Sequence, residues 1–447
     1  MNESLLTVWN ETLRRDPEAV ALIDAATGAK WSRRALDEAA AAWQVVHGRD
    51  LARCTVVLAE ANGLGWLTVF LGLLRSDAVI VALDPGEPVV AQQATARAIK
   101  AHWRWTGSAL EAVATGGRRA RDERRLLKLT SGSTGTPRAL PFTDAQLIAD
   151  ARQVCASMGI APADLNLGLI PFGHSYGLGN LVLPLFVQGT AVIAGVTALP
   201  HAMAEAVARW RPTVFPAVPA LLRALSLAEV PAEAVASLRT VISAGAPLAP
   251  EVAKAFHAKF ARAIHSFYGS SETGGITFDR TGEAALTGRS VGTPLEGVAL
   301  HWERGGRFRV TSAAVFTLGN RRYAESGHGE HRMADIGQWT GQGELALIGR
   351  MGRFVKIAGR RLNLAEVEQA LKRVPGVRDA LVVPHTGRAD ALAAAVATDQ
   401  TAEALREKLR ETLAGWKIPK KIVTLPVFPI TARGKTDTAK LRGMLAG

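Results

Sequence analysis

The chain has 447 residues, of which 48% are hydrophobic and 21% charged, and its formal net charge is +13. This length exceeds what one hydrophobic core organises, so we expect two or three domains, and the apolar content excludes a disordered chain. The positive charge would suit a polyanion, but the basic residues are scattered and no nucleic-acid-binding motif accompanies them. We therefore expect no nucleic acid partner, and an acidic nucleotide, cofactor or carrier instead.

The cysteines and the apolar segments bear on where the protein works. Cys54 and Cys155 are the only cysteines, and they form neither a disulfide framework nor a zinc-binding spacing. The first residues lack the basic start and apolar core of a signal peptide. The charge-free stretch between Asp164 and Glu205 is interrupted by prolines and glycines, unlike a membrane-spanning helix. We expect a cytoplasmic protein with no membrane span.

Helix and strand patterns alternate over about the first 100 residues. The spacing predicts helices over 36–46 and 66–74 and buried strands over 54–58 and 78–83. Such alternation is typical of α/β folds. The charged run 118–125, which follows two glycines, is predicted to be an exposed linker.

The same alternation continues to about residue 348. Strands are predicted over 167–170, 191–194, 213–215, 240–243 and 264–267. With helices between them, these strands predict a twisted sheet covered by helices. We expect binding sites at the carboxyl ends of the strands.

The last hundred residues have a different pattern. A helix begins after Asn363, strands are predicted over 380–383 and 392–397, and a second helix covers 402–413. We expect a large α/β N-terminal domain of layered sheets, residues 1–350. A small α+β C-terminal domain, residues 351–447, would follow it.

The segment from Leu129 to Arg138 combines hydroxyl residues, glycines and one cation directly after an apolar run. Glycines let backbone amides approach an anion, hydroxyls donate to phosphate oxygens, and a cation neutralises the remaining charge. The segment predicts a triphosphate-binding loop, although it lacks the Gly-Lys-Ser/Thr of the common P-loop. The alternative is an ordinary surface turn, which has the same composition.

Further unusual segments follow this loop in a fixed order. They are Pro171–Gly177, Ser243–Leu248, Tyr268–Thr273, Asp335 with Arg350 and Val355–Arg361, and Thr431–Asp437. Together they resemble the adenylate-forming superfamily of acyl-CoA synthetases, peptide-synthetase adenylation domains and firefly-type luciferases, with motifs closest to aryl- and fatty-acyl ligases. The resemblance covers nearly the whole chain. It implies activation of a carboxylic acid with ATP and Mg²⁺ to an acyl-adenylate, release of pyrophosphate, and transfer of the acyl group to a thiol.

The resemblance also assigns nucleotide contacts. It implies phosphate binding by Thr130, Ser131, Gly132, Ser133, Thr134, Gly135, Arg138 and Ser271, with Arg138 in place of the family's usual lysine. It implies adenine and ribose binding by Gly245, Ala246, Pro247, Tyr268, Asp335 and Arg350. The family's usual Thr-Gly before the aspartate is Met333-Ala334 here. Glu272 would hold Mg²⁺ through oxygen, the ligand type that this ion requires.

Lys435 is the residue implied to carry adenylation. The C-terminal domain would swing its ammonium group into the cleft, where it would bridge the attacking carboxylate and the α-phosphate. Gly352 stands where the family usually has a hinge Asp or Lys, and glycine absorbs a backbone rotation. The basic residues Arg353, Lys356, Arg360 and Arg361 would contact the phosphates of CoA or of a phosphopantetheinyl carrier protein. Ordinary solvated charge is the alternative for this cluster.

The acid substrate is implied to meet Phe172, His174, Tyr176, Gly269 and Gly274. Peptide-synthetase domains generally have an Asp where Gly173 stands, to pair with the ammonium group of an amino acid. Since an unpaired ammonium in an apolar pocket is costly, an aryl or fatty acid is favoured over an amino acid. His174 would gate the pocket or orient the carboxylate as a catalytic residue. A hydrogen-bonded core histidine is the alternative.

Two other functions stay open at this point. A luciferase-like oxygenase would share the adenylation step, and a non-catalytic nucleotide sensor would share only the binding of ATP. The chain is shorter than most relatives between Pro85 and Leu126. This shortening raises the case for a free-standing synthetase that acts on an acyl carrier protein, although it does not choose between CoA and a carrier.

Overall fold

A computed structural model of the chain describes residues 3–114, 116–130, 138–317, 326–327, 329–350, 354–357, 360–388, 391–431 and 436–446. By their internal contacts the residues divide into two compact units. The first is Met1–His301 with Arg309–Arg332 and Trp339–Ala346; the second is Trp302–Phe308 with Met333–Gln338 and Leu347–Gly447. Among the described residues, no helix is both long enough and apolar enough to cross a membrane.

The main sheet of the first unit has nine strands in the order β15-β14-β13-β12-β11-β9-β10-β1-β2. The strands are β1 (Val20–Asp24), β2 (Lys30–Ser32), β9 (Leu165–Leu167), β10 (Ala191–Ala194), β11 (Val214–Ala217), β12 (Thr240–Ser243), β13 (Ile264–Ser270), β14 (Gly274–Phe278) and β15 (Thr293–Pro294). Six neighbouring strands, from β13 to β1, run parallel, while β2, β14 and β15 pair antiparallel at the two edges. The loops that follow the six parallel strands therefore all leave from one edge of the sheet, the edge formed by the carboxyl ends of these strands.

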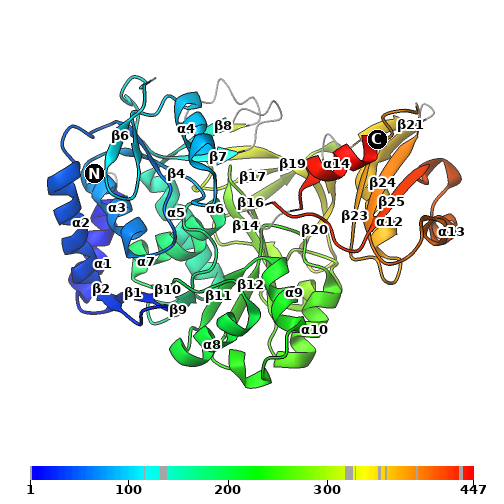
Figure 1. Ribbon diagram of the computed structural model, residues 1–447, viewed down its shortest axis with the longest axis horizontal. Helices are drawn as coiled ribbons and strands as arrows, with labels where there is room; N and C mark the ends of the chain where they lie inside the picture. Colours follow the sequence, from blue (N-terminus) through cyan, green and yellow to red (C-terminus); the bar gives the residue numbers. More distant parts are fainter. Residues whose placement is uncertain are drawn as a thin grey trace. The chain divides into compact units, whose positions relative to one another are not determined.

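Three helices pack against one part of this sheet through a shared apolar core (Figure 1). They are α8 (Pro200–Trp210), α9 (Pro219–Leu227) and α10 (Pro250–Phe260), and α11 (Glu283–Thr287) lies beside α10. Met203, Leu222 and Phe256 from the three helices are all fully buried against Ile193 and Phe215 of the sheet. This core fixes the strands whose carboxyl ends carry the motif segments.

A second sheet of the first unit has the order β6-β5-β3-β4-β7-β8. Its strands are β3 (Thr55–Leu58), β4 (Val79–Ala82), β5 (Trp103–Trp105), β6 (Leu110–Ala112), β7 (Arg124–Thr130) and β8 (Arg138–Thr143). The strands β5, β3, β4 and β7 run parallel, and β7 pairs antiparallel with β8. The remaining helices are α1 (Leu5–Arg15), α2 (Arg33–His47), α3 (Leu64–Arg75), α4 (Val89–Ala98), α5 (Asp144–Met158), α6 (Ser175–Gly177), the π-helical turn Leu178–Val182 and α7 (Leu183–Gln188).

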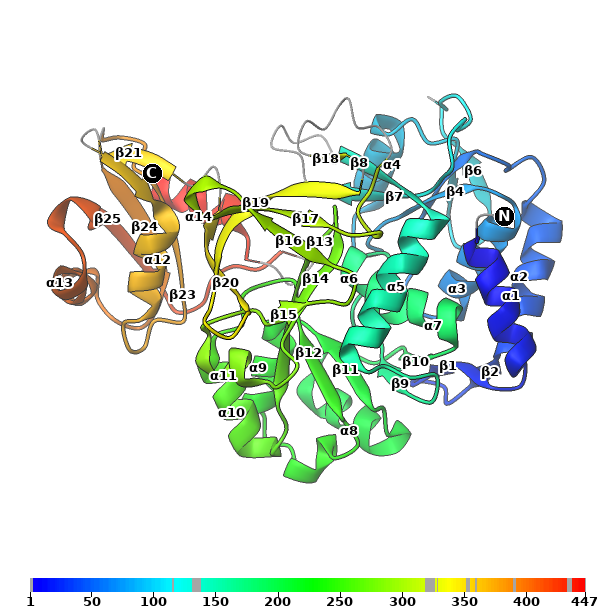
Figure 2. The ribbon, with the colours of Figure 1, turned by 180° about the vertical axis from the view of Figure 1, so that it is seen from behind.

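Helix α5 connects the two sheets. It follows β8 directly and begins with a capping box in which Thr143 and Gln146 bond each other's backbone N–H groups. It contacts β8 of one sheet and β14 of the other, and it lies beside α7 (Figure 2). Side chains of α5 therefore reach residues of both sheets.

A further sheet has the order β16-β17-β19-β18, with β20 paired to β19. Its strands are β16 (Ala299–Trp302), β17 (Arg307–Thr311), β18 (Ser326–Gly327), β19 (Glu330–Trp339) and β20 (Leu345–Arg350). The division between the two units passes through these strands.

The rest of the second unit is a small α+β fold with two apolar cores. A hairpin, β21 (Phe354–Ile357) with β22 (Arg360–Asn363), precedes the sheet β23 (Asp379–Pro384), β24 (Leu392–Ala397) and β25 (Lys421–Leu425), and its helices are α12 (Leu364–Lys372), α13 (Ala402–Thr412) and α14 (Thr438–Ala446). The helices α12 and α13 bury Val367, Leu371, Leu405 and Leu409 in one of these cores.

Two expectations about the elements are wrong in detail. The strand predicted over 167–170 is β9, which runs from Leu165 to Leu167, and beyond it the carbonyls of Gly168 and Ile170 accept from the Asn62 amide instead of from a neighbouring strand. The predicted linker 118–125 loses its last two residues to β7. There Arg125 is held by Asp77 and Asp144, so its charge does not need solvent.

Candidate active site

Three of the motif segments meet at the carboxyl ends of the main sheet. They are residues 171–177 after β9, residues 244–247 after β12, and residues 268–273, which form the end of β13 and the turn that follows it. The Ser175 and Ser271 hydroxyls are hydrogen-bonded at 3.1 Å, which joins the first segment to the third. The Tyr176 hydroxyl donates to the carbonyls of Ala217 and Ile242, at 3.3 and 3.4 Å, and so holds the first segment at the ends of β11 and β12.

The turn between β13 and β14 presents Ser271 and Glu272. The Ser270 hydroxyl accepts from the backbone N–H groups of Glu272 and Thr273, each at 3.2 Å. The N–H of Phe316 donates to the Glu272 carbonyl at 3.3 Å. With its backbone held at both sides, Glu272 is half-buried at the tip of the turn.

Residues 245–247 form an exposed strip beside this turn. Gly245 has φ of +83°, a conformation that favours glycine, and Ala246 and Pro247 are exposed. Tyr268 lies on the neighbouring strand and is half-buried. A flat aromatic side chain beside an open backbone strip can hold a planar base.

The segment after β9 is held from the second sheet. The Asn62 side chain, which follows β3, donates to the Gly168 and Ile170 carbonyls and accepts from the Phe172 N–H at 2.7 Å. A Cβ atom on Gly173 would lie 2.6 Å from the carbonyl oxygen of Leu83, which follows β4. The carboxyl ends of β3 and β4 therefore set the path of this segment.

The aromatic residues of this segment are more buried than a pocket lining requires. Phe172 is 1% exposed and packs edge-on against Trp66, and Tyr176 is 8% exposed. Burial raises the pKa of the Tyr176 hydroxyl, so it acts as a neutral hydrogen-bond donor. His174 is half-buried, and its Nδ1 accepts from the Tyr176 N–H at 3.2 Å.

The predicted phosphate loop joins β7 to β8. Thr130 and Arg138 pair across the two strands at its base, and Arg138 is exposed. The predicted phosphate ligands Ser131, Gly132, Ser133, Thr134 and Gly135 lie outside the described residues. Of this group, the structure places only Thr130 and Arg138.

A buried ion pair connects β7 with the turn that carries Glu272. The Lys128 ammonium on β7 lies 3.8 Å from the Asp150 carboxylate on α5, and both side chains are at most 6% exposed. Burial lowers the pKa of Lys128, while the charges of Asp150 and Glu272 oppose that shift. Asp150 also accepts from the Gly275 N–H at 3.0 Å.

Of the remaining predicted site residues, Gly274 begins β14 in the first unit, and the others belong to the second unit. Asp335 is half-buried on β19, and Arg350 is the last residue of β20. Lys356 pairs with Arg361, and Arg360 with Ile357, across the hairpin of β21 and β22. Gly352, Arg353 and Lys435 lie outside the described residues.

The donor set fits a magnesium ion that arrives with a nucleotide. In the described part of the chain, no cluster of three or more His, Cys, Asp or Glu side chains could form a metal cage. Mg²⁺ commonly binds one or two carboxylates and takes its other ligands from phosphates and water. A single carboxylate at a fixed turn, as at Glu272, meets that requirement.

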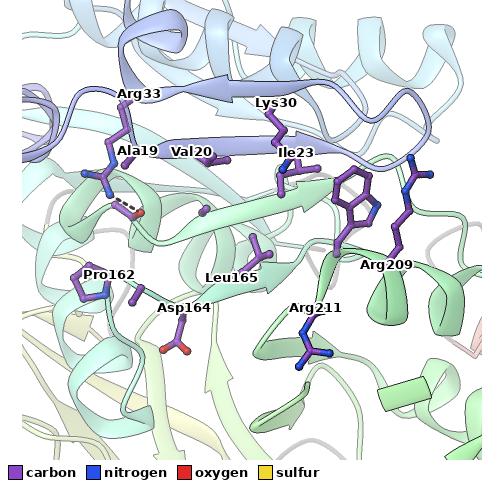
Figure 3. A pocket seen from close by; sticks show the side chains of 14 residues that line it. Ala19, Val20, Ile23, Lys30, Arg33, Pro162, Asp164, Leu165, Arg209 and Arg211 are labelled. Carbon is purple, nitrogen blue, oxygen red and sulfur yellow. Dashed lines mark hydrogen bonds between the residues drawn. The ribbon is translucent and has the colours of Figure 1, made fainter. Parts of the chain in front are cut away.

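A separate hollow of about 480 Å³ lies at the opposite edge of the main sheet (Figure 3). Its lining includes Val20, Leu165 and Ala191 at the amino ends of β1, β9 and β10. Four basic residues line it with one acid, and that acid, Asp164, is already bound to Arg239 at 2.7 Å. Because ligands of open α/β sheets bind at the carboxyl ends of strands, we place the active site at the other edge.

Sequence reasoning missed Asn62, Lys128 and Asp150. Lys128 interrupts the apolar run of Leu126, Leu127 and Leu129, and a charge inside a buried strand is a signal that could have been used. Asp150 is likewise a charge among the apolar residues of α5. Asn62 has no such signal, because its partners lie more than a hundred residues away.

Comparison with known proteins identifies the family. The AMP-binding enzyme family matches residues 117–303, and the AMP-binding enzyme C-terminal domain matches residues 366–435. The ATP-bound MatB from Rhodopseudomonas palustris has a TM-score of 0.85 at 21% identity and covers 100% of this chain and 99% of its own. This likeness confirms the predicted α/β class with layered sheets and a small second domain.

Curated relatives agree with these matches. Phenyloxazoline synthase MbtB from Mycolicibacterium paratuberculosis is 28% identical over 69% of this chain. The benzoate–CoA ligase of Thauera aromatica and the L-proline–[L-prolyl-carrier protein] ligase of Streptomyces coelicolor are each 29% identical over 70% of it. The chain spans 29% of the length of the synthase and 64% and 65% of the two ligases. With two family matches that together cover more than half of its length, the chain belongs to the AMP-binding enzymes of the adenylate-forming superfamily.

Proposed function

We propose that the protein activates a carboxylic acid with ATP to an acyl-adenylate and then transfers the acyl group to the thiol of CoA or of a carrier-protein phosphopantetheine. In the first step a carboxylate oxygen forms a bond to the α-phosphorus, and pyrophosphate leaves. In the second step the thiol sulfur, with loss of its proton, forms a bond to the acyl carbon, and AMP leaves. The protein is an AMP-forming acid:thiol ligase in this proposal.

One observation supports this proposal above the others. Three separate segments, which the resemblance assigns to acid, adenine and α-phosphate with Mg²⁺, meet at one edge of one sheet, and the Ser175–Ser271 hydrogen bond joins the first of them to the third. The base of the glycine-hydroxyl loop, Thr130 with Arg138, belongs to the same unit. If the glycine-hydroxyl loop were an ordinary surface turn, it would not need these three segments in the same unit.

The reaction brings an anionic carboxylate to an anionic triphosphate, so charge must be cancelled where the new bond forms. Glu272 would hold Mg²⁺, which supplies positive charge to the phosphate oxygens. Ser271 would donate to the α-phosphate, and Arg138 would neutralise the outer phosphates. In the second unit Asp335 would accept from the ribose hydroxyls, and Lys435 would donate to the carboxylate and the α-phosphate.

We favour an aryl or fatty acid as the substrate, although the relatives include both an aryl-acid ligase and an amino-acid ligase. Gly173 occupies the position where an aspartate would pair with the ammonium group of an amino acid. Any side chain there would meet the Leu83 carbonyl at 2.6 Å. This site therefore has neither the acid nor the space for it.

Each half-reaction needs a different arrangement around one nucleotide. We propose that the second domain, residues 351–447, rotates about Gly352 between the two steps. The basic residues Arg353, Lys356, Arg360 and Arg361 would then contact the phosphates of the thiol substrate. Two of them, Lys356 and Arg361, pair across one hairpin, which places both positions together.

A pyrophosphate-release screen tests the proposal. Aryl, short, medium and long-chain acids and a panel of amino acids are offered with ATP and Mg²⁺, with and without CoA or a pantetheinylated carrier. We expect release that depends on an aryl or fatty acid, and a thioester only when the thiol is present. Tight ATP binding without turnover on any acid would support a nucleotide sensor instead. Light emission or oxygen uptake would support an oxygenase.

A further inference from the structure

The ion pair of Lys128 and Asp150 has no place in the roles that the family resemblance assigns. Both side chains are almost fully buried, at 3% and 6% exposure. Burying two charges costs free energy, and replacement of such a pair by apolar residues of similar size is often neutral or stabilising. Fold stability alone is therefore a weak reason for its presence.

The pair lies between two parts of the proposed nucleotide site. Lys128 is two residues before Thr130, at the end of β7 that leads into the glycine-hydroxyl loop. Asp150 extends from α5 to the start of β14 and accepts from the Gly275 N–H at 3.0 Å. Gly275 pairs with Gly269 across the hairpin whose turn carries Ser271 and Glu272.

The fit of Asp150 to this turn is close. A Cβ atom on Gly274 would lie 2.2 Å from one Asp150 oxygen and 2.9 Å from the other. Gly274 also has φ of +72°, which a residue with a side chain rarely adopts. The carboxylate therefore occupies the space that any side chain at 274 would take, and the backbone of the turn lies directly on it.

Lys128 faces this carboxylate from β7. Its ammonium group lies 3.8 Å from Asp150 and 4.3 Å from the centre of the Phe142 ring. An unpaired Asp150 would be a buried charge, and it would gain by turning away toward water. With the cation fixed on β7, the carboxylate stays directed at the N–H of Gly275.

We propose that Asp150, neutralised by Lys128, is a positioning residue that tethers the Ser270–Gly275 turn and so fixes Glu272 for the Mg²⁺ of bound ATP. This inference rests on the proposed function for the role of Glu272. Partners of metal-binding groups that fix their orientation typically contribute about 10- to 100-fold to metal affinity. The tether thereby joins the strand before the phosphate loop to the turn that holds the metal.

Two double variants separate the tether from fold stability. Lys128→Met with Asp150→Leu removes both charges and the acceptor for the Gly275 N–H, while it keeps the volume. Lys128→Met with Asp150→Asn removes the same charges but leaves an amide oxygen to accept from Gly275. Because neither variant leaves a lone buried charge, we expect both to fold. Asp164→Asn is the control, because it alters another nearly buried carboxylate, which pairs with the half-exposed Arg239 at the opposite edge of the sheet.

The measurement is ATP binding by calorimetry as Mg²⁺ is varied, together with thermal unfolding. We expect the Met/Leu variant to need about tenfold more Mg²⁺ for half-maximal ATP binding. The Met/Asn variant and the Asp164→Asn control should stay near the wild type. An unchanged Mg²⁺ requirement in Met/Leu, or a Met/Asn variant no better than Met/Leu, would overturn the tether. Binding does not depend on an acid substrate, so failure of the ligase proposal would appear separately, as missing acid-dependent pyrophosphate release.

Discussion

At Gly173 the space for a side chain is filled by the backbone that follows β4. The Leu83 carbonyl oxygen would lie 2.6 Å from a Cβ atom, closer than such contacts occur. The restriction acts on the first carbon of any side chain, whatever its charge. Under the proposed function, substrate choice at this position would be set by steric space as much as by electrostatics.

This restriction predicts that Gly173→Asp does not create an amino acid ligase. We expect Gly173→Asp and Gly173→Ala to lose stability alike, by about 1 to 3 kcal/mol, as overpacked sites do. The measurements are thermal unfolding and pyrophosphate exchange with an amino acid panel. Amino-acid-dependent exchange in Gly173→Asp, absent in Gly173→Ala, would contradict the steric argument.

His102 provides a pH-dependent test at the residue scale. Its Nδ1 accepts from the Thr55 N–H at 2.9 Å, and burial lowers the pKa of the ring from its ordinary value of 6.5. As the pH falls through 6.5, the unfolded chain therefore binds a proton at His102 more readily than the folded chain does. This difference in proton binding contributes stability to the fold above that pH, and the contribution is lost as the pH falls below it.

We expect His102→Asn to lose less stability than the wild type between about pH 7.5 and about pH 5.5, the range in which a histidine titrates. The exposed His201 on α8 provides the control, since His201→Asn leaves the buried ring in place. Denaturant unfolding across this range measures the difference. Equal acid sensitivity in the wild type and His102→Asn would exclude the buried ring as its source.

At the scale of elements, the short helix α6 fixes residues 171–174, the start of the segment proposed to bind the acid substrate, through its backbone. A Cβ atom on Gly177 would lie 2.0 Å from the Pro171 carbonyl oxygen, whereas one on Gly179 would meet its nearest atom at 3.5 Å. The Gly177 contact is with backbone, which cannot turn aside as a side chain can. The loop 171–174 therefore depends on the absence of a side chain at 177.

We predict that Gly177→Ala displaces this loop and raises the KM for the acid about tenfold, the effect of a loss of about 1.4 kcal/mol within the usual cost of overpacking. Gly179→Ala, two residues on, should stay close to the wild type. Steady-state kinetics gives the two KM values separately, with the acid varied at a fixed ATP concentration and ATP varied at a fixed acid concentration. An equal rise in both KM values would point to general unfolding rather than to the acid loop.

Much of the secondary structure and its arrangement follows from the sequence. The strands β10, β12 and β24 have the predicted bounds, because each is a short apolar run with clear ends. Parallel strands also explain why segments from 171 to 273 meet at one edge. The contacts of Asn62 and Asp150 could not be predicted, because each joins residues more than a hundred positions apart that share no spacing rule.

At the scale of the whole molecule, the proposed chemistry is divided between two units. The first carries the acid segment, the adenine strip and the turn of Glu272, and the second carries Asp335 and residues 347–447. In this proposal the second unit contributes both a nucleotide contact, Asp335, and the adenylation residue, Lys435. A substitution at Lys435 would then abolish adenylation while the first unit and Asp335 still bind ATP.

The most direct test of the account is pyrophosphate exchange by Lys435→Ala with an active acid, measured beside ATP binding. Loss of a fixed donor at a developing charge typically costs about 10²- to 10³-fold in rate. Lys440→Ala, an exposed lysine of α14, is the control. We expect exchange to fall by about that factor in Lys435→Ala alone, with ATP affinity unchanged. Exchange within a few-fold of the wild type in Lys435→Ala would contradict the proposed mechanism.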